Sequence, residues 1–428
     1  MRLPKGWWHT RFVLFPLLAA VSLALAGCGG GGGSSPTPTP SPSTAENTQA
    51  IEVNSGPAGD YTNGVFTSVT ICVPGTSNCQ TIKDVLVDTG SEGLRLLSSA
   101  VNLSLPAITD SSSSGNTLNE CAAFADGSYV WGPVVSADIQ MAGEKGSGVP
   151  IQIIDSSNPT KYPVPSSCIS SSSAPENSVQ SLGANGILGV GVFEQDCGSS
   201  CAATTSVPAL YYLCPPTAGS VCNSASVPVQ YQLQNPVWTF PQDNNGLLIS
   251  LPSISDTGVP SVSGSMIFGI GTQSDNALGN AQVYTTDPSG NFHAVYNNID
   301  YSNSFIDSGS NALYFLDATT LNIPECLDSQ GNPTGFYCPQ STLSYTVTTT
   351  GLNGTSNPVS FNIANAFALF AANNGQNFAF NDLGGDSGTS QQTDYVDFGL
   401  PFFFGRKVFV GIENQTGPNG VIGPYWAY

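Results

Sequence analysis

The segments VLVDTGSEGLRLL (residues 85–97) and SFIDSGSNALYFL (residues 304–316) repeat one pattern within a single chain. In each segment, apolar residues precede an aspartate, Asp88 or Asp307. Thr or Ser, then Gly and Ser, follow the aspartate, with leucines at matching positions beyond them. The apolar runs before both aspartates are typical of buried strands. Two acidic loops of one design predict a pair of carboxyl groups that meet at a pseudo-twofold axis, and such a pair predicts a reaction centre.

The D-[ST]-G triplet alone does not identify this pair, because it also occurs at Asp256 and Asp386. Asp256 runs into a Val-Pro step, and Asp386 lies in a polar, glycine-rich stretch, so both are interpreted as turns. The same interpretation is the alternative for the duplicated pair, since Asp-Gly sequences are common in turns between strands. The duplication extends beyond the turn residues, which favours a shared function for Asp88 and Asp307.

Paired aspartates have a defined chemistry. When two carboxyl groups are held about 3 Å apart, ionising both is unfavourable because the two negative charges repel each other, so the groups share one proton. The neutral acid can polarise a carbonyl group while the carboxylate deprotonates a water molecule. We expect the oxygens of Asp88 and Asp307 to lie within about 2.6–3.2 Å at the floor of a cleft. We also expect the pair to titrate as one coupled unit, with activity at mildly acidic pH.

The flanking residues suit this arrangement. Hydroxyl groups directly after each aspartate could cross-link the two loops, the glycines permit close approach of the backbone, and the last serines could hydrogen-bond the outer carboxylate oxygens. In that order, the supporting residues are Thr89 and Ser308, Gly90 and Gly309, and Ser91 and Ser310.

Other catalytic classes lack their residues. A Ser-His-Asp centre would need His293, and the GDSG sequence at residues 385–388 lacks the companion motifs of a serine peptidase. The sequence contains no phosphate-binding loop, no dinucleotide-binding glycine pattern and no H-E-x-x-H. Because no C-x-x-C spacing occurs either, we expect neither a metal ion nor a cofactor.

The N-terminus has the pattern of a targeting segment. Arg2, Lys5 and Arg11 flank a short apolar stretch, and Leu25-Ala26-Gly27-Cys28 is similar to the lipobox of bacterial lipoproteins, in which the cysteine carries the lipid. This resemblance implies a signal peptide over residues 1–27 and a lipid on Cys28. Because Gly29 follows the cysteine, resemblance to Gram-negative lipoproteins implies sorting to the outer membrane. The glycine- and proline-rich residues 28–50 are interpreted as a tether.

The remaining chain of about 380 residues is too long for one core. We expect an all-β protein with an N-terminal lobe over residues 51–275 and a C-terminal lobe over residues 276–428. Each lobe should contain about six to eight strands. Helices are expected only after each acidic loop and around residues 362–372.

Charge and cysteine content indicate the environment. Removal of the three basic residues of the leader changes the formal net charge from −20 to −23, which disfavours nucleic acid as a partner. Ten cysteines remain after Cys28, so five disulfides are expected in an oxidising compartment. Connectivity stays open, but short loops favour four of the pairs and leave one over: Cys72–Cys79, Cys197–Cys201, Cys214–Cys222 and Cys326–Cys338, with Cys121–Cys168 remaining.

Beyond the two loops, the chain resembles the pepsin-like aspartic peptidases. ILG at residues 187–189 is similar to that family's segment behind the first acidic loop, FG at 398–399 to the second, and residues 264–272 to the strand that closes the first lobe. The resemblance implies a bilobal acid-protease fold and an endopeptidase that holds a peptide or protein substrate in its cleft. The chain departs from the family at Asp397, which interrupts the second apolar pair, and at Asn185.

The resemblance also implies a flap residue over the cleft, for which Phe124 and Tyr129 are the candidates. A second resemblance, carried by residues 71–79 and 87–97, is to a family of Gram-negative lipoproteins without an assigned function. Two alternatives to a peptidase therefore stay open. One is an inactive bilobal protein that binds a peptide or glycan between its lobes, and the other is a structural envelope lipoprotein. We expect a monomer that contacts the membrane through its lipid.

Overall fold

The computed structural model describes residues 46–428 apart from residues 110–114, 125–126, 170–172, 204–209 and 388–394. The described residues form 25 strands in two sheets of sixteen and nine strands, together with helices of at most six residues. The predicted all-β class with few short helices is confirmed. The predicted number of six to eight strands per lobe is wrong, because several strands of two or three residues carry no periodic pattern that a sequence could display.

The larger sheet contains every strand of the described residues before residue 275 and three strands that follow it. Its strands are β1 (Thr48–Asn54), β2 (Gly64–Cys72), β3 (Cys79–Asp88), β4 (Glu92–Leu97), β5 (Thr117–Ala123), β6 (Ser128–Met141), β7 (Glu144–Ile154), β8 (Ala174–Pro175), β9 (Gly186–Val190), β10 (Tyr211–Cys214), β11 (Asn223–Ser224), β12 (Gly246–Ser250), β13 (Val262–Phe268), β14 (Val283–Thr285), β24 (Lys407–Gly411) and β25 (Tyr425–Ala427).

The smaller sheet is built from the second half of the chain alone. Its strands are β15 (Phe292–Tyr296), β16 (Ile299–Ile306), β17 (Leu313–Phe315), β18 (Glu325–Leu327), β19 (Pro333–Tyr337), β20 (Leu343–Thr350), β21 (Ser356–Ile363), β22 (Gly384–Gly385) and β23 (Val396–Phe398). The α-helices are α1 (Asn158–Lys161), α2 (Val179–Leu182), α3 (Ser199–Ala203), α4 (Ala318–Leu321) and α5 (Ala366–Ala371).

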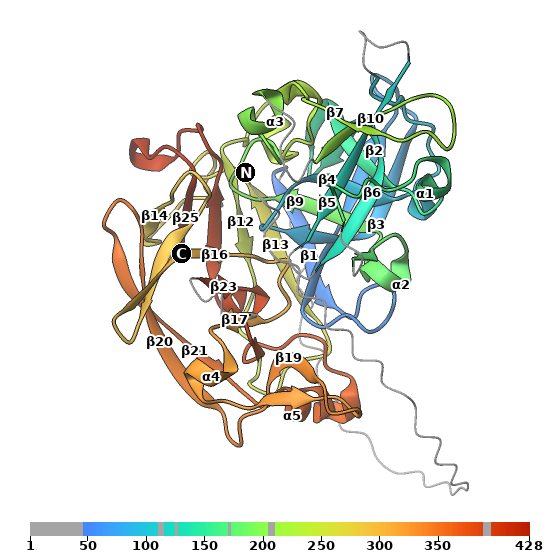
Figure 1. Ribbon diagram of the computed structural model, residues 1–428. Helices are drawn as coiled ribbons and strands as arrows, with labels where there is room; N and C mark the ends of the chain where they lie inside the picture. Colours follow the sequence, from blue (N-terminus) through green and yellow to red (C-terminus); the bar gives the residue numbers. More distant parts are fainter. Residues whose placement is uncertain (1–45, 110–114, 125–126, 170–172, 204–209, 388–394) are drawn as a thin grey trace, which may run out of the picture.

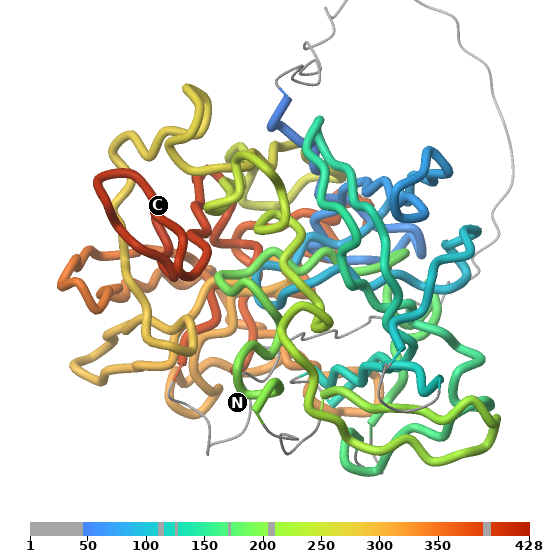
Figure 2. The backbone as a smooth tube through the Cα atoms, turned by 90° about the horizontal axis from the view of Figure 1, so that it is seen from above, coloured from blue at the N-terminus to red at the C-terminus, as the bar shows by residue number. Residues whose placement is uncertain are grey.

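A run of antiparallel strands from both ends of the chain lies between the two halves. β1 pairs with β13, β13 with β12, β12 with β24, and β24 with β25. Figure 1 shows β1, β12 and β13 near the centre, with β2 to β7 on one side and β17 to β21 on the other. In Figure 2 most of residues 50–200 lie on the right and most of residues 290–370 on the left. Strands β24 and β25 therefore belong to the larger sheet, although they follow the expected lobe boundary at residue 275.

Each half of the molecule contains the same three-strand unit. In the first half, β9 lies between β3, with which it pairs in parallel, and β4, with which it pairs antiparallel. In the second half, β23 lies between β16 and β17 with the same two orientations. Each acidic loop connects the outer strands of its unit, so the middle strand runs behind the loop. This placement reproduces the sequence repeat as a structural repeat.

The helix predictions had mixed outcomes. A helix around residues 362–372 is confirmed, since α5 begins after Asn365, whose side chain accepts a hydrogen bond from the Ala368 N–H. The helices expected after the acidic loops are wrong, because those residues form β4 and β17. Every residue of both strands is buried. A run that is apolar on all sides fits a strand covered on both faces, and periodicity alone does not separate it from a buried helix.

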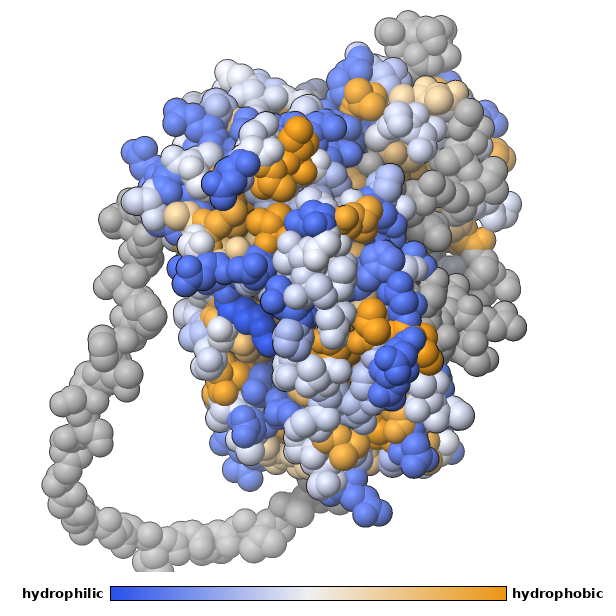
Figure 3. All heavy atoms as spheres, turned by 90° about the vertical axis from the view of Figure 1, so that its left-hand side faces the viewer, coloured by the Kyte–Doolittle hydropathy of each residue, from blue (hydrophilic) through white to orange (hydrophobic). Residues whose placement is uncertain are grey.

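The fold also begins earlier than the expected boundary at residue 51. β1 starts at Thr48, and the buried side chain of Asn47 donates a hydrogen bond of 3.1 Å to the carbonyl oxygen of Phe268. On the face of the molecule in Figure 3, apolar side chains form small patches among polar ones. Exposed apolar residues scattered in this way are ordinary on protein surfaces.

Asn63, in the turn between β1 and β2, connects the two halves. Its amide donates to the carbonyl oxygens of Asn311 at 2.8 Å and Phe380 at 2.9 Å, and its oxygen accepts from the Phe380 N–H at 2.7 Å. The side chain is fully buried, and its backbone has a left-handed φ of 52°. Because Asn311 directly follows the second acidic loop, this connection ties that loop to the first half of the chain.

Candidate active site

The two predicted aspartates occupy equivalent places. Asp88 is the last residue of β3, Asp307 directly follows β16, and both are fully buried. In each loop the glycine N–H two residues later donates to the Oδ1 of its aspartate, at 2.8 Å for Gly90 and 2.7 Å for Gly309. The hydroxyl group of the serine that follows each glycine is hydrogen-bonded to Oδ2 of the same aspartate. The repeated sequence thus produces the same hydrogen bonds twice.

The hydroxyl residues after each aspartate cross-link the loops reciprocally. The Thr89 N–H donates to Oγ of Ser308 at 3.1 Å, and the Ser308 N–H donates to Oγ1 of Thr89 at 2.9 Å. Each hydroxyl in turn donates to a carbonyl oxygen of the opposite strand, Ser308 to Val87 at 2.8 Å and Thr89 to Ile306 at 3.3 Å. Four hydrogen bonds therefore hold the loops together about a local twofold axis, as their sequences predicted.

The glycines allow each loop to contact the opposite aspartate. A Cβ added at Gly90 would lie 2.6 Å from Cγ of Asp307, and one added at Gly309 would lie 2.6 Å from Oδ1 of Asp88. Real Cβ atoms essentially never come this close to other heavy atoms. Only glycine fits at either position without displacing the acid across the axis.

The two carboxyl groups interact directly. Burial raises the pKa of Asp307 well above its ordinary value, and the charge of Asp88, the charge of Asp397 and a hydrogen bond with the Asp88 side chain raise it further. Two carboxyl groups can share a hydrogen bond only when one of them carries a proton. The arrangement therefore favours a neutral Asp307 beside Asp88, although the catalytic role of the pair stays a prediction.

Asp397 is a third acid at this site, and its position is one that the sequence interpretation treated only as an interruption. Its side chain is fully buried on β23, and its Oδ2 accepts a hydrogen bond of 2.6 Å from the Ser310 hydroxyl. The same hydroxyl lies 3.0 Å from Oδ2 of Asp307. An acid within an otherwise apolar strand segment was the available signal for this contact, because a buried carboxyl needs a polar partner.

The two flap candidates lie in different environments. The Phe124 N–H donates to the Ser128 carbonyl oxygen at 2.8 Å, and β5 and β6 pair as antiparallel strands. Phe124 belongs to an apolar cluster with Leu86 and Ile187. Leu86 precedes Asp88 by two residues and therefore projects from the same face of β3.

Tyr129 packs instead in a cluster with Trp131 and the cysteines Cys121 and Cys168, and burial raises the pKa of its phenol. Of the two candidates, Phe124 is thus the one that packs with residues beside Asp88. Two residues of the predicted flap, 125 and 126, lie outside the described part of the chain. The position of the hairpin over a cleft stays a prediction.

A buried ion cluster lies close to the first acidic loop, and the sequence interpretation did not anticipate it. The Arg95 guanidinium is 2.5 Å from the carboxyl group of Glu120 on β5 and 3.3 Å from that of Asp196, and it donates to the Glu92 carbonyl oxygen at 2.8 Å. Burial alone would lower the pKa of Arg95, but its two acidic neighbours raise it above its ordinary value. The cluster joins β4, which begins beside the acidic loop, to the β5–β6 hairpin.

Asp196 in this cluster is a candidate for protonation. Burial and the neighbouring Glu120 raise its pKa well above the ordinary value, and the Tyr211 hydroxyl donates to it at 2.8 Å. One guanidinium against two carboxyl groups leaves an excess negative charge in a buried site, which explains the direction of this shift.

All five expected disulfides are present. They pair Cys72 with Cys79, Cys121 with Cys168, Cys197 with Cys201, Cys214 with Cys222, and Cys326 with Cys338. The Cys121–Cys168 bond anchors β5 of the hairpin to the segment after α1. The expected lipidation residue, Cys28, lies outside the described residues.

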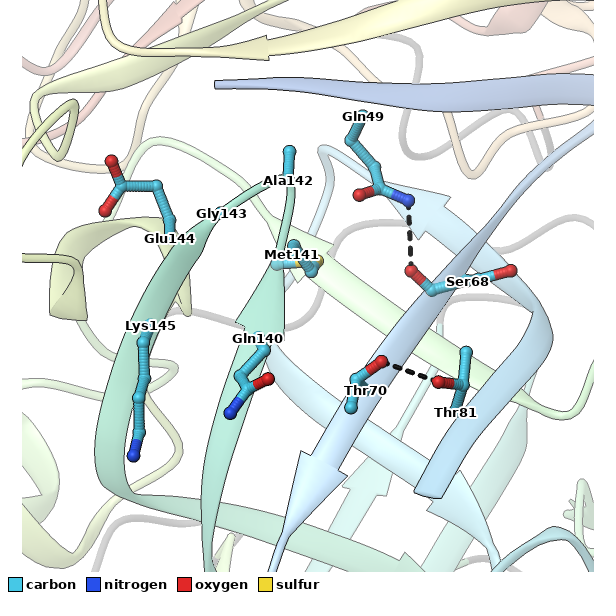
Figure 4. A pocket seen from close by; sticks show the side chains of 10 residues that line it. All are labelled: Gln49, Ser68, Thr70, Thr81, Gln140, Met141, Ala142, Gly143, Glu144 and Lys145. Carbon is cyan, nitrogen blue, oxygen red and sulfur yellow. Dashed lines mark hydrogen bonds between the residues drawn. The ribbon is translucent and has the colours of Figure 1, made fainter. Parts of the chain in front are cut away.

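A polar pocket of about 560 Å³ lies elsewhere on the molecule, across strands β1, β2, β3, β6 and β7. Figure 4 shows its lining and the hydrogen bonds from Gln49 to Ser68 and between Thr70 and Thr81. It is lined by Gln49, Ser68, Thr70, Thr81, Gln140, Met141, Ala142, Gly143, Glu144 and Lys145. None of these residues belongs to the acidic loops, so the pocket is separate from the candidate active site.

Neither a metal-ligand cluster nor a membrane-spanning helix is found in the described residues. Within that part of the chain, no group of three or more His, Cys, Asp or Glu side chains has an arrangement that could hold a metal ion. Over the same residues, no helix has both the length and the apolar character needed to cross a bilayer.

Comparisons with known proteins place the fold. A family profile described as "Protein of unknown function (DUF3443)" matches residues 43–428. The structure is similar to the crystal structure of an aspartic proteinase from Irpex lacteus, with a TM-score of 0.50 and 12% sequence identity. That match covers 89% of this chain and 96% of the proteinase, and it shows a pepsin-like fold. No curated protein sequence matches the chain.

Proposed function

The chain belongs to the DUF3443 family, whose description assigns no function, and we propose that it is an aspartic endopeptidase acting through Asp88 and Asp307. The observation that carries the proposal is the reciprocal fit of the two loops. Each glycine sits where a Cβ would strike the opposite aspartate, and each hydroxyl residue bonds to the opposite loop. A pair of turns without a joint function would not need such mutual contacts.

The roles of the two acids differ in this proposal. Asp307, whose pKa is raised first by burial and then by Asp88, carries the shared proton and donates it toward the carbonyl oxygen of a peptide bond. Asp88, held by the Gly90 N–H and the Ser91 hydroxyl, acts as the carboxylate that deprotonates the attacking water. The proton then passes to the leaving nitrogen, so that hydrolysis needs no other reactant than water and peptide.

The substrate proposed is a peptide or protein, without a nucleic acid partner. The support for a peptide substrate is the pepsin-like fold. The high negative charge of the chain disfavours polyanionic substrates.

A second candidate function is binding of a peptide or glycan between the halves without cleavage. It is favoured by the flap candidates, because Phe124 has no hydroxyl group and Tyr129 packs against the Cys121–Cys168 region. In this case the carboxyl pair would serve as a polar contact for the ligand.

For localisation we propose a lipid-anchored protein of the cell envelope, attached through Cys28 at the outer membrane of a Gram-negative bacterium. The five disulfides support an oxidising compartment. Mass spectrometry of the purified mature protein tests the anchor, because a lipid on Cys28 adds the mass of its acyl chains to the N-terminal peptide.

Cleavage of a mixed peptide library by the full chain, between about pH 3 and pH 7, tests the enzymatic proposal. Asp88→Asn and Asp307→Asn should each lower the cleavage rate by about 10²–10⁴-fold, with the circular dichroism spectrum unchanged. Asp256→Asn, at the exposed aspartate of another D-T-G triplet in the same sequence, is the matched control and should cleave at the wild-type rate. A properly folded protein that binds peptides but cleaves none would instead support the binding function.

A further inference from the structure

The second half of the molecule carries a buried acid where the first half carries an apolar residue. On β9 Ile187 pairs with Leu86 and Arg95, and on β23 Asp397 pairs with Phe305 and Tyr314. Leu86 and Phe305 each precede their aspartate by two residues, so Asp397 occupies the position equivalent to Ile187. Both side chains are fully buried. The repeated unit is therefore symmetric in backbone and asymmetric in charge.

The asymmetry reaches the carboxyl pair through a serine. In the first half, the Ser91 hydroxyl donates to Asp88, and Ile187 at the equivalent of Asp397 has no polar atom on its side chain. In the second half, the Ser310 hydroxyl lies 3.0 Å from Oδ2 of Asp307 and 2.6 Å from Oδ2 of Asp397. Ser310 thus bridges two carboxyl groups, whereas Ser91 meets one.

Counting hydrogen atoms limits the protonation of this bridge. A serine hydroxyl carries a single hydrogen and can direct it at one carboxyl oxygen. If Ser310 donates to Asp397, then Asp307 must be protonated to donate to Ser310. If Ser310 donates to Asp307, then Asp397 must carry the proton. In both arrangements one proton resides on Asp307 or Asp397, and the two interconvert when both hydrogens shift together along the chain.

We propose that Asp397 is a positioning residue that stores the proton of the Asp88–Asp307 pair and returns it to Asp307 through Ser310. The inference rests on the proposed function, because it gives the proton of the acid in that reaction, Asp307, a second site on Asp397. While the proton rests on Asp397, Asp397 donates to Ser310 and Ser310 donates to Asp307. When both hydrogens shift along the chain, Asp397 gives its proton to Ser310 and Ser310 gives its own hydrogen to Asp307, so Asp397 is left ionised and Asp307 becomes the acid that protonates the substrate carbonyl. The number of protons is conserved, and Asp307 regains its proton from a hydroxyl group of the tetrahedral intermediate when that intermediate collapses.

The groups around Asp397 are consistent with this role. β16 contributes Phe305 beside it and leads into Asp307, while β17 contributes Tyr314, whose hydroxyl donates to Oδ1 of Asn311 at 2.8 Å. Burial raises the pKa of Asp307 most, and the charges of Asp88 and then Asp397 raise it further. Replacing Asp397 by a neutral amide removes the last of these contributions. It also offers an N–H donor to Ser310, which frees the serine hydrogen for Asp307 and favours its ionised form.

Titration of the aspartate carboxyl carbons by ¹³C NMR, from about pH 2 to about pH 9, tests the proposal without requiring cleavage. In the full chain, Asp397→Asn should lower the upper apparent pKa of the coupled group by about one unit. Ser310→Ala should interrupt the bridge, so adding Asp397→Asn to Ser310→Ala should cause less than half of that shift. Ser310→Thr, which keeps the hydroxyl group, is the matched control and should titrate like the wild type.

The outcomes separate the two proposals. An unchanged upper pKa in a folded Asp397→Asn protein overturns the proton store, whether or not the wild type cleaves peptides. The same shift with and without the Ser310 hydroxyl also overturns it, because charge alone would then explain the effect. If Asp397→Asn does not fold, Asp397→Ile, which copies the first half, takes its place in the same titration. The predicted shift in a protein that cleaves nothing supports the bridge and contradicts the endopeptidase.

Discussion

The two halves of the molecule build the same loop and surround it differently. β3, β9 and β4 in the first half correspond to β16, β23 and β17 in the second. In the first half, Ile187 on the middle strand pairs with Arg95, and the charged residue of this pair, Arg95, contacts Glu120 and Asp196. In the second half, Asp397 on the middle strand pairs with Tyr314, and the charged residue of this pair, Asp397, contacts Ser310 of the acidic loop. The backbone and the loop hydrogen bonds are repeated, whereas the electrostatic environment is not.

This difference indicates how a symmetric scaffold produces unequal acids. A pair with identical surroundings would have no reason to place its shared proton on one side. The buried negative neighbour at Asp397 favours the proton on Asp307, while in the first half the buried carboxyl groups of Glu120 and Asp196 contact Arg95. The reaction proposed above uses this inequality, with Asp307 as acid and Asp88 as base.

The largest effect on stability is expected where the halves differ most. Arg95→Met leaves Glu120 and Asp196 buried without their cation, which should lower the free energy of unfolding by about 3–5 kcal/mol. The matched change in the second half, Tyr314→Phe, removes one hydrogen bond to Asn311 and should cost about 1 kcal/mol. Urea unfolding at pH 7 measures both values. Equal losses in the free energy of unfolding for the two variants would contradict the difference between the two halves.

Where the halves agree, substitutions should have equal effects. Gly90→Ala and Gly309→Ala each push a methyl group against the opposite aspartate, so each should lower stability by about 1–3 kcal/mol and reduce peptide cleavage strongly. Parallel measurements of unfolding and cleavage on both variants check the symmetry. A mild effect at one glycine and a severe effect at the other would show that the loops do not interlock reciprocally.

A smaller effect concerns pH. Burial and the neighbouring Asp256 raise the pKa of Asp382 in the second half to about 6, above its ordinary value of 3.8. Between these values the folded state binds more protons than the unfolded state, so this acid lowers stability as pH rises from about 4 to about 6. Asp382→Asn should stabilise the protein at pH 7 by about 1–2 kcal/mol and leave it unchanged near pH 3.

Thermal unfolding across this pH range measures the effect. Asp256→Asn is the control, because it removes only the neighbouring charge and should shift stability in the same direction by less. Greater stability of the wild type than of Asp382→Asn at pH 7 would contradict the buried position of this acid.

Local repetition made much of the site predictable from the sequence. Asp88, Asp307 and their flanking residues belong to two copies of one short sequence. Each copy begins with an apolar run that predicts a strand, so each aspartate is expected at the end of a strand. Four of the five disulfides follow from short loops, which close at little entropic cost in almost any fold, and the fifth, Cys121–Cys168, joins the two cysteines that remain. Each of these features depends on residues that are close in sequence or duplicated.

The features that escaped prediction depend on distant partners. Ser310 meets Asp397 across 87 residues, and Arg95 meets Asp196 across 101, so no local pattern indicates either contact. The sequence predicts a helix in place of β4 for a related reason. β4 is hydrogen-bonded to β7 at one edge and to β9 at the other, and all of its residues are buried, but a periodicity argument contains neither the pairing nor the cover of its faces.

The central claim is that Asp88 and Asp307 share one proton that resides on Asp307. Infrared spectroscopy of the full chain near pH 5 measures it directly, because protonated and ionised carboxyl groups absorb at separate frequencies. The account predicts that Asp307→Asn loses the signal of about one protonated carboxyl group relative to the wild type, while Asp256→Asn keeps it. Equal amounts of protonated carboxyl in the wild type and in Asp307→Asn would contradict the claim.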